Sequence, residues 1–461
     1  MRRIAVTCAV VLVAVFIGLA AKQPQQDPRL HKASRAPDQN GWIFVHLEGS
    51  PADIGYQHGF LLAREIEDAR KAIEISLTHD AKPWAFFRDA AEHVLWPKLP
   101  NEYQTEIQGI AEGARARGVK IDSVDLTVMN AWLELSPYYL NWYEKSQKHP
   151  TGDRCSAFVA TGSYTKDGRP VIAHNNWTDY LTGSRWNIIF DVKPASGHAF
   201  IMDGMPGLIH SGDDFGLNSA GIMITETTIS EFHGFDPTGV AEFARARRAM
   251  QYASTIDDFA RLMQEGNNGG YANDWLVADR NTGEVASLEL GLKNVNLKRT
   301  KDGYFVGSNY PIDPKLTAEE TNYDLSNKSL SANARHIRWD AIMAQYKGKI
   351  DLALAQKFLG DHYDTFDNKE QPSERTLCGH IELSARGSKP WQPEFAPAGA
   401  VQAKATTAVL SESMQMTAAL GHPCGIHFKA ARHLSAHPEF AWQKPSLRDL
   451  DSHPWTGFKA K

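Results

Sequence analysis

Apolar residues recur at helical spacing in the first third of the chain. Steps of three or four residues give the stretch from about 50 to 77 one apolar face, formed by Leu62, Ile66, Ala69, Ile73 and Leu77. A second helix is predicted over 101–117, with Gly118 placed to end it. A strand is predicted at 41–50, and residues 41–154 are otherwise predicted to be mostly helical.

The pattern changes at residue 155, where β-branched and alternating apolar residues replace the helical spacing. Two predicted strands, 156–162 and 169–174, flank Lys166-Asp167-Gly168, and Asp-Gly between such runs is a strong hairpin signal. Further strands are predicted at 186–193, 198–203, 221–229, 275–279 and 285–290. Helices are predicted at 240–250, 255–265, 329–346, 351–361 and 405–420. Runs of strands bracketed by runs of helices favour a layered α+β fold over alternating βαβ units.

The first forty residues have the composition of a targeting segment followed by a linker. Two arginines precede an apolar run at 4–19 and small residues at 20–21, so residues 1–21 are interpreted as a secretory signal peptide. An uncleaved membrane anchor is the alternative, because the run approaches the shortest membrane span of about 17 residues. Residues 22–40 are polar and proline-rich and are predicted to be a flexible leader. Export would place the protein in a periplasm or outside the cell.

The overall composition excludes some classes of function. The formal net charge is −5 and no long basic run is present, which argues against binding to nucleic acid. A hydrophobic fraction of 42% with 22% charged residues is ordinary for a globular protein with an ample core. The sequence contains no Gly-x-Gly-x-x-Gly phosphate loop, and no cofactor is predicted.

The chain has four cysteines, of which one lies in the predicted signal peptide. In an oxidising compartment Cys378 and Cys424 are the plausible disulfide partners. A zinc site formed by Cys378, His380, Cys424 and His427 is the rival interpretation, but Cys-x-His is not a standard zinc spacing, so no metal is predicted. Either way Cys155 is left over, and an unpaired thiol in an exported protein requires a reason.

Cys155 would acquire chemistry if the chain were cut before it. An N→S acyl shift between the Cys155 thiol and the Arg154 carbonyl, followed by hydrolysis, would give Cys155 a free α-amine. That amine has an ordinary pKa of about 7.7 to 8, so it can act as base toward its own thiol. The alternative is that Cys155 is a small buried hydrophobic residue.

The segments that follow resemble those of a known enzyme group. Cys155-Ser156-Ala157-Phe158, the Lys-Asp-Gly turn, and Ala173-His174-Asn175-Asn176-Trp177 look like the nucleophile hairpin of N-terminal-nucleophile hydrolases related to bile-salt hydrolase and penicillin acyltransferase. Within that group they most resemble the phospholipase B-like proteins. The similarity continues in order through 206–215, 221–228, 268–275, 308–311 and 399–406. Upstream, 55–59 and 109–114 look like propeptide motifs of the acyltransferase branch.

This resemblance implies a fold and a division of the chain. The fold would be a four-layer αββα sandwich of two antiparallel sheets between helices. Residues 41–154 would be a helical propeptide or light subunit, and residues 155–461 the catalytic portion. After cleavage between Arg154 and Cys155, the N-terminal fragment would stay bound as a partner.

The resemblance also implies roles for individual residues. Cys155 would be the nucleophile and, through its amine, the general base. Thr228 and Asn309 fall where related enzymes hold oxyanion-stabilising groups. Arg335 is similar to the arginine that closes the site, with Arg338 as the alternative match.

Supporting positions follow from the same comparison. In the related hydrolases an aspartate precedes the hairpin tryptophan, whereas Asn176 stands here, so His174 is expected to substitute for it. Asn273 is a weaker candidate beside the oxyanion groups. Asp213, Asp214 and Glu226 are expected to support the site or a turn rather than to act as catalytic acids.

The implied activity is hydrolysis of an acyl bond through a thioester. By resemblance the substrate is a phospholipid or other lipid-like acyl ester, met by transient contact with a membrane surface. An amidase or acyltransferase acting on N-acyl small molecules is the alternative, because the same residues would serve both. A non-catalytic binding protein that kept the fold is a third possibility.

Overall fold

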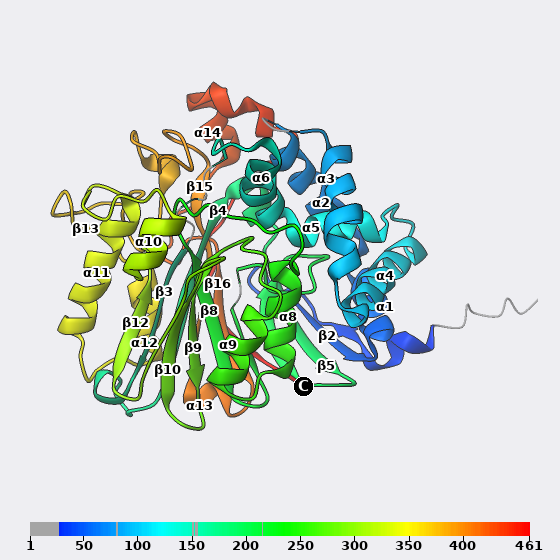
Figure 1. The fold of residues 1–461 in the computed structure, drawn as a ribbon, viewed down its shortest axis with the longest axis horizontal. Coiled ribbons are helices and arrows are strands. Elements are labelled where there is room, and N and C mark those ends of the chain that lie inside the picture. The colour runs from blue at the N-terminus through cyan, green and yellow to red at the C-terminus, as the bar shows by residue number, and fades with distance from the viewer. Residues whose placement is uncertain (1–26, 80–81, 150–151, 153–154, 214) are drawn as a thin grey trace, which may run out of the picture.

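A computed structural model describes residues 27–79, 82–149, 152, 155–213 and 215–461. Two β-sheets lie face to face in it, and helices cover both outer faces (Figure 1). The expected α+β sandwich of four αββα layers is therefore confirmed. The predicted signal peptide, Arg154 and Asp214 lie outside the described residues.

Among the described residues the larger sheet has nine strands, in the order β1-β2-β5-β6-β7-β8-β9-β10-β11. Strands β2 and β5 pair in parallel, and the other neighbouring strands of this sheet pair antiparallel. The strands are β1 (Ser34–Arg35), β2 (Ile43–Gly49), β5 (Ile188–Pro194), β6 (Phe200–Gly204), β7 (Gly216–Asn218), β8 (Ile222–Thr228), β9 (Asn273–Asp279), β10 (Glu284–Leu290) and β11 (Val295–Thr300).

The smaller sheet holds the predicted hairpin at its centre. Over the described residues its order is β12-β3-β4-β15-β16-β17. The register of the hairpin places Cys155 opposite Asn176 and Ala157 opposite His174. The strands are β3 (Cys155–Thr161), β4 (Val171–Asp179), β12 (Gly303–Gly307), β15 (Ala398–Thr407), β16 (Gln415–Leu420) and β17 (Thr456–Lys459), with β13 (Tyr363–Asp364) and β14 (Lys369–Glu370) forming a separate ribbon.

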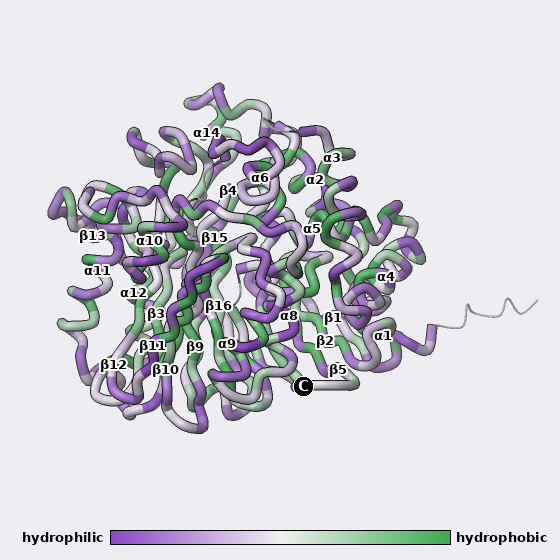
Figure 2. Tube along the Cα trace, viewed as in Figure 1, coloured by the Kyte–Doolittle hydropathy of each residue, from purple (hydrophilic) through white to green (hydrophobic). Residues whose placement is uncertain are grey.

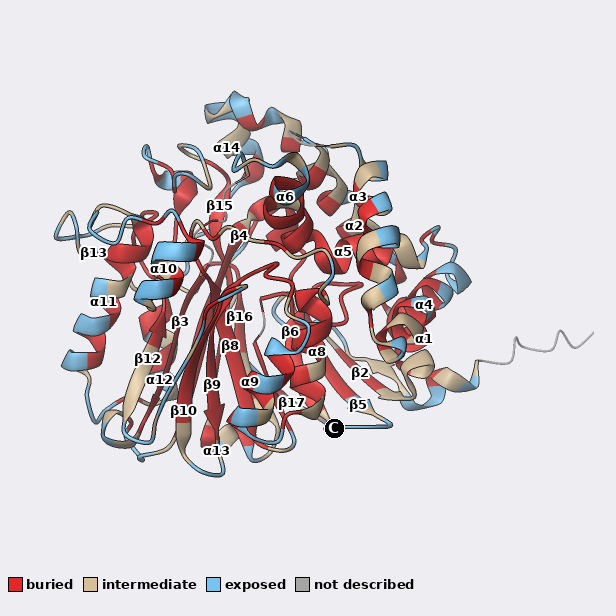
Figure 3. Cartoon of the chain, viewed as in Figure 1, coloured by how far each residue is buried: buried red, intermediate tan, exposed pale blue. Residues whose placement is uncertain are grey.

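Alternation along the hairpin strands buries both faces of the smaller sheet. Val159 and Ile172 face the larger sheet and pack with residues such as Leu276. Their neighbour Phe158 points the other way, against Trp339 of α11 (Ser331–Gln345) and Phe358 of α12 (Leu352–Leu359). Figure 3 shows these central strands as buried along most of their length.

The outer face of the larger sheet is covered mainly by the N-terminal helices, drawn in blue to cyan in Figure 1. They are α1 (Pro51–Leu61), α2 (Ala63–Thr78), α3 (Trp84–Ala90), α4 (Asn101–Ala116), α5 (Ser123–Glu134) and α6 (Leu140–Glu144), joined by α8 (Glu242–Tyr252) and α9 (Ile256–Gln264). Shorter helices are α7 (Tyr180–Gly183), α10 (Pro314–Glu320), α13 (Ala408–Ser411) and α14 (Ala430–Ala436). Figure 2 shows the hydrophobic positions gathered on the inner elements and the hydrophilic ones on the outer loops.

The segment 27–40, expected to be part of a flexible leader, is built into the fold. It forms a short 3₁₀ helix and strand β1, which pairs with β2. The guanidinium of Arg29 stacks 3.5 Å from the ring centroid of Tyr56, and Gln57 donates to the Arg29 carbonyl at 2.7 Å. Contacts with helix α1 therefore order a stretch whose composition indicates a linker.

The helix predicted over 405–420 is wrong. The chain there completes strand β15, makes the single turn α13 and continues as strand β16. Strand β15 is rich in alanine, which has the highest helix propensity. The side chains of β15 are nevertheless buried between neighbouring strands and layers. Small side chains are required at the centre of this sandwich, so packing overrides the local propensity.

No helix among the described residues combines the length and the apolar character that crossing a bilayer requires.

Helices α1 and α4 cross with their backbones in contact, because each presents glycines to the other. A β-carbon added to Gly55 would lie 2.0 Å from the carbonyl oxygen of Glu106, and one added to Gly59 would lie 2.0 Å from that of Ile110. On the facing helix, a β-carbon on Gly113 would lie 2.2 Å from the Tyr56 carbonyl oxygen. Any larger residue must push the helices apart.

We therefore expect Gly59→Ala to lower the free energy of unfolding by about 1–3 kcal/mol, because it overpacks this crossing. Gly457→Ala is the matched control, since a β-carbon at Gly457 would meet no atom within 4 Å. Urea unfolding of both variants measures the difference. Equal stabilities of the two variants would contradict the close crossing.

Candidate active site

Cys155 is the first residue of β3 and lies buried between the two sheets. Its backbone nitrogen donates to Oδ1 of Asn309 at 3.2 Å. This contact puts a side-chain acceptor at the atom that would become the α-amine if the preceding peptide bond were cut. The structure thus brings together two residues that are 154 positions apart in sequence.

Asn309 follows strand β12 and is held from three sides. Its φ of 67° is in the left-handed region, which asparagine tolerates better than most residues. Its Nδ2 donates to the carbonyl of Thr228 at 2.8 Å, and its own carbonyl accepts from the Ser230 backbone at 3.1 Å. The amide is therefore fixed with Oδ1 toward Cys155 and Nδ2 toward the end of β8.

Arg335 of α11 closes the other side of this network. One guanidinium nitrogen donates to the Cys155 carbonyl, and another donates to Asn309 Oδ1 at 2.8 Å. The guanidinium also lies 4.4 Å from the ring centroid of Trp177. Arg338, one turn further along α11, instead pairs with Asp361, so the structure places Arg335 and not Arg338 beside Cys155.

The ends of β8 and β9 bring further polar groups to the same place. Thr228 pairs in register with Asn273. Within the described chain, Thr228 Oγ1, both side-chain polar atoms of Asn273 and Nδ2 of Asn176 are buried without a hydrogen-bond partner. Buried polar atoms are normally satisfied. A group of unsatisfied ones at the head of the hairpin is what a site for a polar reacting group requires.

The histidine and glutamate expected in supporting positions are also close. The ligand-capable atoms of Cys155, His174 and Glu226 all lie within 4.8 Å of one another. His174 Nδ1 is 3.9 Å from Asp213 Oδ2, which is too long for a hydrogen bond. Glu226 accepts from the Tyr271 hydroxyl at 3.0 Å. His174 is therefore placed to contact a cysteine amine or thiol.

A buried charged cluster lies next to this group on the larger-sheet side. The ammonium of Lys404 contacts Asp213, and it lies 3.2 Å from Asp203. Gln402 Nε2 donates to Asp203 at 2.6 Å and to Asp213 at 3.0 Å. The Ser211 hydroxyl contacts both carboxylates. Asp213 thus lies beside the group around Cys155, and its contacts with Lys404, Gln402 and Ser211 were not predicted.

The sequence pointed only indirectly to that cluster. Gln402 and Lys404 alternate in an otherwise small and apolar stretch, which is the pattern of a strand with one polar face. The prediction of a helix from residue 405 obscured this signal. Asp203 lies at the end of a predicted strand and carried no motif of its own.

Burial controls the titration of these groups. Burial, reinforced by the Glu226 and Asp213 carboxylates, raises the pKa of the Cys155 thiol well above its usual range. Burial and the Lys404 charge hold the pKa of His174 well below its usual range. Burial and the neighbouring Asp213 raise the pKa of Asp203, whereas the two carboxylates raise the pKa of Lys404 against the effect of burial. In the intact chain Cys155 is therefore a neutral thiol.

An aromatic cavity of about 710 Å³ opens where the two portions of the chain meet. Tyr138, Trp142 and Tyr143 line it from the end of the N-terminal portion, and Phe232 and Phe235 from the segment after β8. That segment includes Ser230, which contacts Asn309. Phe232 of the cavity and Ser230 of the Cys155 network are thus two positions apart in the sequence.

The Cys378–Cys424 disulfide is not formed in this structure, in which Cys155, Cys378 and Cys424 are all free. The sulfurs of Cys378 and Cys424 lie instead 3.5 and 3.4 Å from Nε2 of His380. His427, the fourth ligand of the rival zinc interpretation, is exposed and contacts Asp451.

Comparison with known proteins confirms the predicted resemblance. The phospholipase B family model matches residues 87–290. A phospholipase B-like 1 protein of Caenorhabditis elegans is 25% identical over 336 residues, which are 65% of this chain and 57% of that protein. An uncharacterized protein of Archaeoglobus fulgidus is 27% identical over 54% of this chain and 42% of its own length. The chain spans about half the length of these two relatives.

The acyltransferase branch is also represented. The 40 kDa form of acyl-coenzyme A:6-aminopenicillanic-acid acyltransferase of Emericella nidulans is 26% identical over 54% of this chain and 63% of that protein. Among solved structures, conjugated bile acid hydrolase of Clostridium perfringens matches 67% of this chain and 97% of its own, with 11% identity and a TM-score of 0.37.

We expect Lys404→Met to destabilise the protein by about 3–5 kcal/mol, because it leaves the buried Asp203 and Asp213 without their cation. In the variant the pKa of Asp203, already raised by burial, rises further because the ammonium that lowered it is gone. The folded state then binds more protons above the unfolded pKa of about 3.9, so the defect should grow as pH rises from 5 to 8.

Lys429→Met is the matched control, because Lys429 pairs with Asp449 and Asp451 at the surface. Its effect should stay below about 1 kcal/mol. Urea titrations at several pH values compare the two variants. A Lys404→Met defect that is small, or that does not depend on pH, would show that the cluster does not hold these charges.

Proposed function

We propose that the chain is a cysteine N-terminal-nucleophile hydrolase that cuts itself before Cys155 and then cleaves acyl bonds through a thioester. One observation carries the proposal: the Cys155 nitrogen bonds to Asn309 Oδ1 at the head of a buried hairpin, where Arg335 fixes the same amide. Any buried backbone N–H needs an acceptor, but here the acceptor is a side-chain oxygen that Arg335 also binds, and it could equally hold an α-amine.

Cleavage would begin with attack of the Cys155 sulfur on the Arg154 carbonyl carbon. The peptide C–N bond breaks, a thioester forms, and the nitrogen becomes the α-amine of Cys155. Water then hydrolyses the thioester and leaves a carboxylate on Arg154. The raised pKa of the thiol keeps this step slow until a proton acceptor is in place, and His174 and Glu226 both lie within 4.8 Å as candidates.

In the mature protein the α-amine would accept the proton of the Cys155 thiol. Asn309 Oδ1 would orient the amine, as it orients the amide nitrogen in the uncut chain. The thiolate attacks the acyl carbonyl, the ammonium protonates the leaving group, and water releases the acid. Thr228 Oγ1 and Asn273 Nδ2 are buried, without hydrogen-bond partners in the described chain, and available to stabilise the oxyanion.

The names of the relatives and the aromatic cavity support a lipid-like acyl ester as substrate. A cavity of 300–1,000 Å³ lined by aromatic side chains suits an acyl chain. Because residues 137–147 line it, the N-terminal fragment would remain a bound partner after cleavage. Transient contact with a membrane surface and export through the predicted signal peptide belong to the same proposal.

A second candidate is amide chemistry on an N-acyl small molecule. It is favoured by the similarity to a penicillin acyltransferase over 54% of this chain. The residues around Cys155 serve both reactions, because its ammonium can protonate an oxygen or a nitrogen leaving group. Turnover of lysophospholipid, phospholipid and N-acyl amino acid substrates distinguishes the two, and turnover of the amides alone would select the second.

We expect intact mass spectrometry of the purified protein to show two fragments, of which the larger begins at Cys155. Cys155→Ala should abolish both cleavage and turnover, because the nucleophile of both reactions is lost. Cys155→Ser should still cut while turning over more slowly. An active preparation whose chain is continuous across residues 154 and 155 would refute the proposal, and unchanged melting temperatures would show that the variants fold.

We also expect Trp142→Ala and Phe235→Ala to raise KM about tenfold for long-chain esters, a loss of ~1.4 kcal/mol of binding, while short-chain esters are unaffected. Phe366→Ala is the control, because this exposed ring stacks on Arg375 away from the cavity. Kinetics over a series of acyl lengths measure the effect. An equal change for short and long chains would place the acyl group elsewhere.

A further inference from the structure

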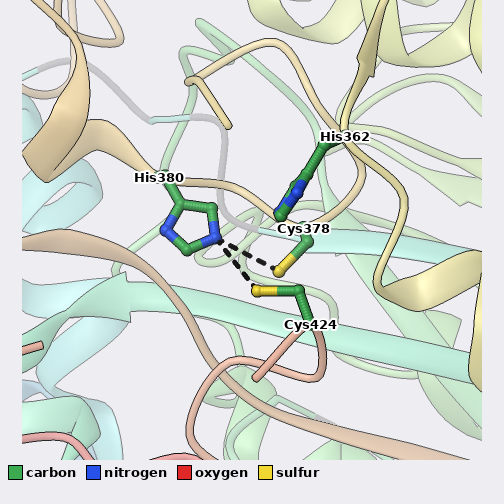
Figure 4. A group of neighbouring side chains, drawn as sticks. All are labelled: His362, Cys378, His380 and Cys424. Carbon is green, nitrogen blue, oxygen red and sulfur yellow. Dashed lines mark hydrogen bonds between the residues drawn. The ribbon is translucent and has the colours of Figure 1, made fainter. Parts of the chain in front are cut away.

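We infer that His362, Cys378, His380 and Cys424 form a binding site for one zinc ion. The ligand-capable atoms of these four side chains all lie within 4.8 Å of one another. Figure 4 shows the two imidazole rings and the two sulfurs converging from separate segments of the chain. The site is independent of the proposed catalytic reaction, and it uses a histidine that the rival sequence interpretation did not include.

The distances fit tetrahedral zinc. Zn–S bonds of about 2.3 Å and Zn–N bonds of about 2.0–2.1 Å at tetrahedral angles put each sulfur about 3.5 Å from each nitrogen. The His380 Nε2 atom lies 3.5 Å from the Cys378 sulfur and 3.4 Å from the Cys424 sulfur. Two thiolates with two imidazoles are a common ligand set for structural zinc.

The surrounding hydrogen bonds orient His380 as a metal ligand. Its Nδ1 contacts Glu382 at 2.8 Å, which leaves Nε2 directed to the sulfurs. Glu382 also accepts from the Tyr180 hydroxyl at 2.6 Å, and Tyr180 contacts His422 at 2.9 Å. A carboxylate behind a histidine is the usual second layer of a zinc site, because it fixes the tautomer and raises the basicity of the ring.

A disulfide does not account for the same arrangement. It would bring the two sulfurs to about 2.05 Å and remove the thiolates that the two rings face. The half-buried His362 and the buried His380 would then lie beside an apolar bond, with Glu382 still holding His380 in place. A metal uses all four side chains at once.

The position of the site indicates a structural role. Its ligands come from the segment after α12, the turn before η6 (Ile381–Leu383) and the loop after β16. Leu377 lies in the sequence between the ligands His362 and Cys378. Its carbonyl accepts from Asn175 at 2.9 Å and from Trp177 at 3.3 Å. Zinc would therefore anchor the loop that supports strand β4, opposite Cys155 in the hairpin.

The test is metal analysis of the full chain, expressed in zinc-supplemented medium and purified without chelator. We expect about one zinc per chain in the wild type. The double variant Cys378→Ser/Cys424→Ser and the single variant His362→Ala should each contain at least about tenfold less zinc per chain than the wild type. His427→Ala is the matched control and should keep it, because His427 pairs with Asp451 outside the cluster.

Two measurements keep the test decisive where a variant fails to fold. Replacing the zinc of the wild type by cobalt should give the charge-transfer and visible bands of tetrahedral cobalt bound to thiolates. Alkylation in denaturant and chelator but without reductant, followed by peptide mapping, should label both Cys378 and Cys424. A disulfide-linked pair of peptides, a metal-free wild type, or full zinc content in the cysteine variant would each overturn the inference.

Discussion

The contact between the Cys155 backbone nitrogen and the Asn309 side chain is the constraint around which the site is arranged. It requires β3 to begin at Cys155, and it requires the turn after β12 to take up a left-handed conformation at Asn309. Arg335 then binds both ends of the contact from helix α11, on the opposite side of the sheet from Lys404. Three elements far apart in sequence thus meet at the backbone of one residue, Cys155.

The four-layer architecture encloses the head of the hairpin on both sides. Both faces of the hairpin are buried, one against the larger sheet and the other against α11 and α12. Burial keeps the thiol protonated and His174 neutral, while the costly charges are confined to the cluster of Lys404 with Asp203 and Asp213. Under the proposed function, reactivity would therefore depend on cleavage of the chain before Cys155.

The sequence was most informative where local signals and packing agree. The hairpin from Cys155 was predicted because an Asp-Gly turn separates two β-rich runs, and the helix at 101–117 because its apolar spacing is regular. Strand β11 was not predicted, and most of its side chains are exposed. Of strand β15, only residues 405–407 fell within a predicted element, and that element was a helix. The partners of Cys155 could be named only by resemblance, and the roles of Lys404 and His362 depend on long-range packing that no local pattern records.

Strand β2 adds a further consequence through its parallel pairing with β5. A break before Cys155 would turn the larger sheet into one β-structure shared by two polypeptides. Neither piece could be synthesised alone and later mixed, because each would expose half of a hydrophobic interface and aggregate. Assembly must then precede scission, so only molecules that have already reached the native topology would gain a reactive terminus. Misfolded molecules would then remain without a reactive terminus.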